Sequence, residues 1–338
     1  MNKATTVENP LGYERVGRLL ARYAIPSIIA LIINSLYNMV DQIFIGQGVG
    51  FLGNGATNII APIATITIAI ATLFGDGLAA FFSLSLGKGE GEKAAKGLGR
   101  SIIYGSIFGI IWTVIAFAFL RPLCLIFGAT ENILPYALDY GRIIVIGFTF
   151  QIVGNTINSA IRTDGSPRYA MLSMMIGAIL NIILDPIFIF VFHWGVEGAA
   201  IATIISQLFG LLFNIAHLFG LKTIKLSRQS FTFDIRTAGR IASLGFASGA
   251  NNLTSTVVAF VSNNLMTKYG ALSPYGADIP LTTFGLCMKV SMLAFSIGIG
   301  VASGSQPIIG FNYGAKKYDR VKKTFLLGAG VATIITFV

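Results

Sequence analysis

The lysines and arginines of this chain gather in alternate polar gaps between long apolar runs. Of the 24 Lys and Arg, 20 lie in five polar stretches, at 1–22, 88–100, 162–168, 222–240 and 316–323. The intervening gaps at 46–54 and 193–198 hold none. A soluble protein has no reason to alternate in this way, whereas a polytopic membrane protein does, because its positively charged loops stay in the cytoplasm. The net charge of +10 is therefore a signal of topology, and we expect no nucleic-acid partner.

The composition also favours a membrane protein over a soluble one. Apolar residues make up 54% of the chain and charged residues only 11%, whereas soluble domains carry roughly 25% charged residues. The two cysteines, Cys124 and Cys287, suggest neither a metal site nor a disulfide framework. The polar N-terminus shows no cleavable signal peptide, so the first span is expected to serve as an uncleaved insertion signal.

The apolar runs predict an all-α polytopic fold with about 8.5 spans. We expect complete spans at 20–45, 56–86, 101–120, 136–160, 169–192, 196–220, 241–267 and 282–311. The basic stretches place the N-terminus inside, so that odd-numbered spans run outward. A ninth run begins at Thr324 and has only about 14 residues at Val338, too few to cross a core of about 30 Å. We therefore expect a truncated or partly covered protein.

The second and eighth spans, with the loops that follow them, resemble each other. At an offset of 223 residues they share six identities, which are Gly75/Gly298, Gly77/Gly300, Ala79/Ala302, Gly87/Gly310, Gly91/Gly314 and Lys93/Lys316. An offset of 221 lays the first span over the seventh. The copies are six spans apart and run in the same direction, which predicts a parallel repeat around an axis along the membrane normal.

A parallel repeat that begins again at the seventh span predicts two lobes with six helices in each complete lobe. Residues 1–220 would form the N-lobe, and 241–338 the start of the C-lobe. The segment 221–240 alternates basic and apolar residues, which suits a cytoplasmic amphipathic linker on an anionic leaflet.

Three motifs resemble the multidrug and toxic compound extrusion (MATE) family, close to its bacterial MepA-like branch. They are PSIIALIINSLYNMVDQIFIG in the first span, LNIILDPIFIF in the fifth, and SQPIIGFNYGAKKYDRV after the eighth. The resemblance covers the chain from Pro26 to the basic loop near Lys323. It implies a twelve-helix, two-lobed, cation-coupled exporter in the bacterial plasma (inner) membrane, with a cytoplasmic N-terminus and many passes.

Charged residues inside spans are costly, and they mark functional sites by default. At 1.5 Å per residue, Asp41 lies roughly 6 Å below the outer surface, and Asp185 and Thr203 lie roughly 10 Å below it. Asn181 and Asp185 share one helix face. Buried carboxylates could bind H⁺, or Na⁺ with help from Asn and Thr. The resemblance implies that these four residues form a cation-coupling network. The alternative places Asp41 at the headgroup interface and makes Asp185 a helix-ending residue before Pro186.

Other polar or bending positions are candidates for the substrate cavity or for gating. They are Asn34, Asn38, Pro26, Asp76, Asn155, Asn251, Asn252 and Lys289. Pro26 can bend the first span or form a static kink. Asp76 is either a cavity charge or a packing residue, and Lys289 either pairs with a carboxylate or extends outward to the interface. Asn251 and Asn252 either face the cavity or form interhelical hydrogen bonds.

We expect a transporter rather than an enzyme: an antiporter, driven by H⁺ or Na⁺, that exports mainly cationic organic compounds by alternating access. No GxxxxGK[ST] nucleotide loop and no cofactor motif is present in the sequence. The chain is expected to act as a monomer in the bilayer. The first alternative is a flippase for lipid-linked oligosaccharides, which the near absence of basic partners for Asp41, Asp76 and Asp185 argues against. The second is a non-transporting membrane fragment.

Overall fold

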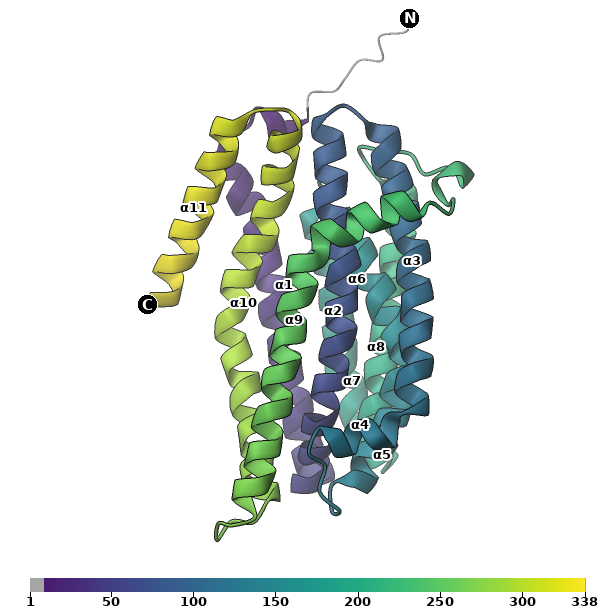
Figure 1. Cartoon of the computed structure of the whole chain (residues 1–338), viewed down its shortest axis with the longest axis vertical. Coiled ribbons are helices and arrows are strands. Elements are labelled where there is room, and N and C mark those ends of the chain that lie inside the picture. Colours follow the sequence, from purple (N-terminus) through teal and green to yellow (C-terminus); the bar gives the residue numbers. More distant parts are fainter. Residues whose placement is uncertain (1–8, 338) are drawn as a thin grey trace, which may run out of the picture.

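The structure is a computed structural model that describes residues 9–337, and these form a bundle of long helices (Figure 1). The helices are α1 (Val16–Gly48), α2 (Phe51–Gly87), α3 (Gly91–Ala118), α4 (Leu120–Ile126), α5 (Leu134–Ile144), α6 (Phe148–Thr163), α7 (Pro167–Pro186), α8 (Gly195–His217), α9 (Ile235–Gly270), α10 (Asp278–Gly314) and α11 (Tyr318–Phe337). No strand occurs among the described residues. The predicted all-α fold is confirmed.

Most of the long helices are apolar enough to cross a bilayer. Among the described residues, six helical segments meet this condition by length and composition, and α10 makes a seventh if its two parts, bent by 43°, count as one span. The predicted seventh span lies within α9. This helix is 36 residues long, but it contains too many Asn, Ser and Thr residues to be apolar enough by the same condition. The predicted fourth span is one segment, Leu134–Thr163, built from α5, a short 3₁₀ turn and α6.

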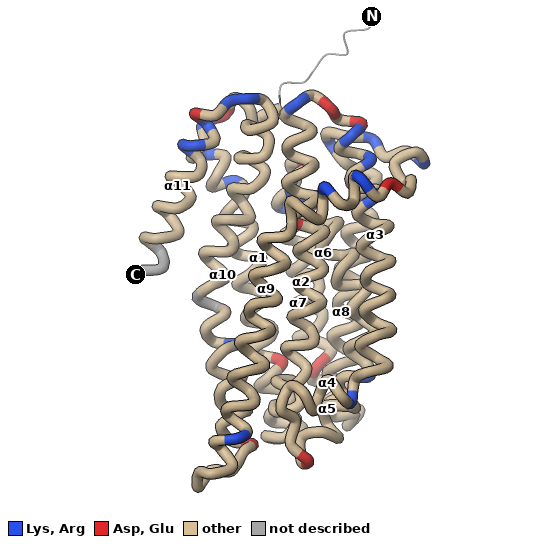
Figure 2. Tube along the Cα trace, viewed as in Figure 1, with Lys and Arg blue, Asp and Glu red and all other residues tan. Residues whose placement is uncertain are grey.

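The basic residues that cluster in alternate gaps of the sequence also lie together at one end of the structure. Lys and Arg gather at the end of the bundle where α1 begins, where the α2–α3 turn lies, and where α10 leads into α11 (Figure 2). We call this the basic end; it carries the stretches 88–100, 162–168, 222–240 and 316–323. The opposite end, called the far end, holds few of them.

Glycines of the internal repeat allow helices from the two repeat copies to touch. A Cβ on Gly77 of α2 would lie 2.2 Å from the Ile241 carbonyl oxygen of α9, and one on Gly300 of α10 would lie 2.5 Å from an Ile28 side-chain carbon on α1. Helix α9 packs on α2, and α10 packs on α1 and α2. Because the repeat equates α1 with α9 and α2 with α10, the α2–α9 and α1–α10 contacts are equivalent. These glycines therefore have a packing role, while the division into lobes stays a prediction.

The segment 221–234 crosses the basic end mostly without regular structure, apart from a short 3₁₀ turn, Arg228–Ser230. Ile224 is buried against α2 and α3 residues, whereas Phe233 is 73% exposed. Asp164, which follows α6, holds the start of this segment by accepting hydrogen bonds from the Lys222 and Thr223 backbone N–H groups. Burial raises the pKa of the Asp164 carboxyl, even though these donated hydrogen bonds act to lower it.

Candidate functional site

Two carboxyl groups meet in the interior of the bundle. Asp41 of α1 is 8% exposed and Asp185, in the last turn of α7, is fully buried. The two carboxyl groups interact electrostatically with each other. Two ionised carboxylates that are buried near each other repel, which favours a proton or another cation between them.

A local change of helix geometry follows Asp185. The α-helix ends at Pro186, which lacks a backbone N–H, and a π-helical turn, η3 (Ile187–Val191), continues the chain. Such π turns within helices are frequent at functional sites, because they change the direction of side chains and release backbone groups from the regular ladder. The turn forms part of the cluster's surroundings toward the far end.

Asn181 connects Asp185 with the neighbouring helix α8. Its Nδ2 donates to Asp185 Oδ1 at 3.2 Å and lies 3.4 Å from Thr203 Oγ1. The structure thus brings together all four residues of the predicted coupling network. Within the described part of the chain, three buried oxygens of this cluster have no hydrogen-bond partner: Asp41 Oδ1, Asp185 Oδ2 and Asn181 Oδ1. Oxygen acceptors of this kind suit a proton or a hard cation such as Na⁺.

A basic side chain of α10 also approaches the cluster. Lys289 Nζ donates to Thr57 Oγ1 of α2 at 3.2 Å, and the Gln42 amide donates to the same oxygen at 2.9 Å. The Lys289 ammonium acts electrostatically on Asp41. Lys289 therefore points into the bundle and not outward to the interface. Sequence reasoning missed Gln42 and Thr57; the only available signal was their polarity within apolar runs.

The α1 candidates follow the helix toward the basic end. Asn38 Nδ2 donates to the Asn34 carbonyl oxygen at 2.7 Å. Asn34 and Asn155 line a cavity of about 190 Å³ between α1, α6, α7 and α8, which also reaches Asn181. Pro26 is buried inside α1, which continues as one helix on both sides of it.

The remaining candidates lie apart from the carboxyl pair. Asp76 forms an ion pair with Arg162 at 4.0 Å, so the argument that this carboxylate lacks a basic partner is wrong. Although it belongs to a basic stretch, Arg162 is the last-turn residue of α6, and its side chain is only 13% exposed. Asn252 forms an interhelical hydrogen bond to Thr72 of α2 at 3.2 Å, while Asn251 is exposed.

Comparison with known proteins identifies the family. A family model described as MatE matches residues 26–187 and 247–338. The multidrug export protein MepA of Staphylococcus haemolyticus (strain JCSC1435) is 26% identical over 318 residues, which cover 91% of this chain and 66% of that protein. MepA of Staphylococcus aureus (strain MSSA476) is 24% identical, with coverage of 96% and 71%. The chain thus spans about two thirds of the length of these relatives.

Solved structures show the same likeness in three dimensions. A MOP superfamily transporter from Pyrococcus furiosus Vc1 (DSM3638) superposes with a TM-score of 0.86 at 25% identity, covering 96% of this chain and 71% of that one. An outward-facing conformation of a multidrug resistance MATE family transporter gives a TM-score of 0.85, with the same identity and coverage. The motifs, the multi-pass helical fold and the family match agree, and the chain belongs to the MatE family of multidrug efflux (MATE) transporters.

Proposed function

We propose that this protein is an antiporter that exports organic, mainly cationic compounds by alternating access, driven by the inward movement of H⁺ or Na⁺. The observation that carries the proposal is the burial of the Asp41 and Asp185 carboxyl groups in one cluster, where one oxygen of each has no hydrogen-bond partner among the described residues. The proposed setting is the bacterial plasma membrane, with the basic end in the cytoplasm because positively charged loops stay on that side.

The charge of the cluster explains why one monovalent cation would bind there. Asp41 and Asp185 carry two negative charges when both are ionised, and Lys289 supplies one positive charge. The remaining negative charge is costly in a buried site, and one H⁺ or Na⁺ would neutralise it. The unpartnered oxygens of Asp41 and Asp185 are the positions at which that cation would be held.

The position of Lys289 suggests how the cation would affect the rest of the bundle. Lys289 belongs to α10, whereas Asp41 and Thr57 belong to α1 and α2. A cation between the carboxyl groups would reduce the attraction of Asp41 for Lys289, and would thereby weaken a contact between the two repeat copies. Linkage then requires that the cation and the exported compound weaken each other's binding if they favour opposite states.

The test is efflux of a fluorescent organic cation, ethidium, from proteoliposomes under an imposed pH or Na⁺ gradient. We expect gradient-dependent efflux that Asp41→Asn abolishes, because the amide keeps the shape but can neither take up a proton nor balance a cation. The control is Glu131→Gln, an exposed carboxylate outside the cluster, which should leave efflux unchanged.

Two outcomes would contradict the proposal at different levels. Efflux that persists in Asp41→Asn would retain the exporter but reject this coupling site. Folded, correctly oriented protein without gradient-dependent efflux would reject the antiporter and favour a flippase or a non-transporting protein.

A further inference from the structure

The 190 Å³ cavity begins at Asn181 and Thr203, the members of the carboxyl cluster that line it, and extends toward the basic end. Asn181 and Thr203 line it beside the cluster, and Ser173 and Asn214 line it nearer the basic end. Thr203 and Asn214 are both on α8, and a separation of eleven residues corresponds to roughly 16 Å along a helix. At roughly 30 Å³ per water molecule, the cavity has room for about six waters.

The lining of this cavity mixes apolar and polar side chains, has no charged residue and is rich in unsatisfied acceptors. Among the described residues, four of its buried side-chain oxygens have no hydrogen-bond partner: Asn181 Oδ1, Ser206 Oγ, Gln207 Oε1 and Asn214 Oδ1. Asn181, Ser206 and Asn214 are each at most 5% exposed. Leaving such atoms dry costs about 1–3 kcal/mol each, so water is expected there. Three of the four are amide oxygens, whose partial negative charge favours a cation over an anion.

A larger cavity, of about 1190 Å³, lies at the basic end and starts one helical turn further on. Its lining includes Leu172, the neighbour of Ser173, and His217, three residues after Asn214. Tyr169 also lines it, and its ring stacks on Phe213 at 4.5 Å and on His217 at 3.9 Å. The Tyr169 hydroxyl donates to the Phe213 carbonyl oxygen at 2.9 Å. This ring therefore bridges α7 and α8 near the boundary between the two cavities.

We propose that the two cavities form a water-filled route by which the coupling cation passes from the Asp41–Asp185 cluster to the basic end, with the Tyr169 ring as its closure. The inference rests on the proposed function, because it assigns that cation its path. The route lies among α1, α6, α7 and α8, and does not pass between the two repeat copies. The cation can then leave toward the cytoplasm without opening the α2–α9 or α1–α10 contacts on that side.

The test measures whether cysteines in the route react from the basic end. Ser206→Cys on α8 and Ala178→Cys on α7 each place a thiol in the lining, in protein whose Cys124 and Cys287 are replaced by alanine. The probe is Ag⁺, a monovalent cation that binds thiolates, added outside inside-out membrane vesicles. The fraction of thiols that escapes Ag⁺ is then labelled with a fluorescent maleimide after denaturation.

We expect both cysteines to react with Ag⁺, and Tyr169→Leu to raise the rate severalfold by opening the closure. Gly154→Leu should lower the rate at least tenfold, because Gly154 lines the cavity and a Cβ there would meet nothing closer than Leu211 at 3.9 Å. Gly239→Leu is the matched control, since this exposed glycine of α9 has no atom within 4 Å of its added Cβ, and it should not change the rate.

The route would be overturned if neither the Ser206→Cys nor the Ala178→Cys thiol reacts with Ag⁺ added at the basic end. So would reaction rates that Gly154→Leu leaves equal to those of Gly239→Leu. Because thiol reactivity does not depend on drug efflux, failure of the route can be told apart from failure of the antiporter. Coupled efflux with unreactive cysteines would reject the route alone, whereas reactive cysteines without coupled efflux would reject its use for coupling.

Discussion

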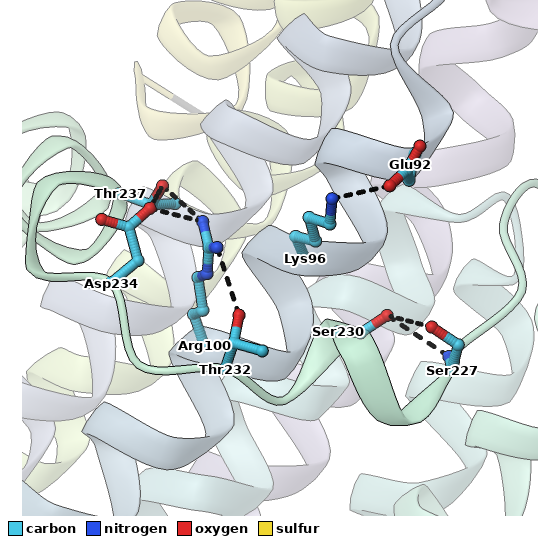
Figure 3. A network of polar contacts seen from close by, with 8 residues as sticks. All are labelled: Glu92, Lys96, Arg100, Ser227, Ser230, Thr232, Asp234 and Thr237. Carbon is cyan, nitrogen blue, oxygen red and sulfur yellow. Dashed lines mark hydrogen bonds and ion pairs between the residues drawn. The ribbon is translucent and has the colours of Figure 1, made fainter.

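Carboxylates are placed in opposite ways in the interior and at the basic end of this molecule. In the interior, Asp41 and Asp185 each keep one oxygen without a hydrogen-bond partner among the described residues. At the basic end, both oxygens of Asp234 accept hydrogen bonds. Oδ2 accepts from Arg100 at 2.7 Å and from Thr237 at 2.8 Å (Figure 3). Oδ1 accepts from the Arg236 N–H. The interior pair thus has an unused oxygen on each carboxyl group, whereas both oxygens of Asp234 are already engaged.

The surroundings of Asp234 favour permanent ionisation. The hydrogen bond from Thr237, with help from the Arg236 N–H and the Arg100 charge, lowers the pKa of its carboxyl. Asp234 also caps the N-terminus of α9 through the Arg236 N–H, and Arg100 on α3 donates to Thr232 as well (Figure 3). The lesson of the comparison is that the same residue type forms an anchor where its acceptors are satisfied, and a potential binding site where they are not.

Among changes to the basic partners of these carboxylates, the largest effect is expected from Lys289→Met, which would leave the interior pair without its basic neighbour. The carboxyl groups would then hold a proton or Na⁺ more tightly, because the cluster would carry two negative charges when empty. We expect gradient-driven ethidium efflux to fall at least tenfold, since release of the cation to the inside becomes slow. The loss of the charged hydrogen bond to Thr57 should also lower stability by about 1–3 kcal/mol, measured from thermal melting.

Lys268→Met is the matched control for this change, because Lys268 lies at the far end of α9, over the Tyr269 ring. A cation–π contact of this exposed kind is worth about 0.5–1 kcal/mol, and its loss should not alter coupling. Equal efflux in Lys289→Met and Lys268→Met would contradict this prediction, because the Asp41–Asp185 pair would then work without its basic neighbour.

The sequence was enough to predict the helices and the four members of the carboxyl cluster. Depth along each span placed Asp41, Asp185 and Thr203 at similar levels, and the spacing of four residues placed Asn181 beside Asp185. The inward direction of Lys289 could not be derived, because it depends on how α10 is rotated against α2. The partner of Asp76 was missed because Arg162 stands in a basic stretch, and only the structure shows it reaching into the bundle.

The ion pair of Asp76 and Arg162 lies between the two extremes of the comparison, since its side chains are 27% and 13% exposed. Arg162→Met would leave Asp76 partly buried without its counter-charge, and we expect a loss of stability of about 1–2 kcal/mol. Thermal melting of the purified protein measures it. Arg168→Met, an exposed arginine of the same basic stretch, should have almost no effect. If Arg162→Met lowers stability no more than Arg168→Met does, then the interior and basic-end carboxylates differ in their burial and not in their pairing with a basic residue.

The smallest effect is expected from Arg100→Met at the basic end. Pairs near the surface contribute little, so the melting temperature should fall by at most about 2 °C, and by less at high salt, which screens exposed charges. The pKa of Asp234 is lowered in the folded protein, so its contribution is present above the unfolded value of about 4 and is lost as the pH falls further. The difference in melting temperature between Arg100→Met and the unaltered protein should therefore shrink below about pH 4.

Lys96→Met is the control on the same helix. Lys96 pairs with the exposed Glu92, and its replacement should shift the melting temperature even less. A loss from Arg100→Met as large as that from Lys289→Met would mean that the basic-end anchor, and not the interior cluster, is where this fold depends most on charge.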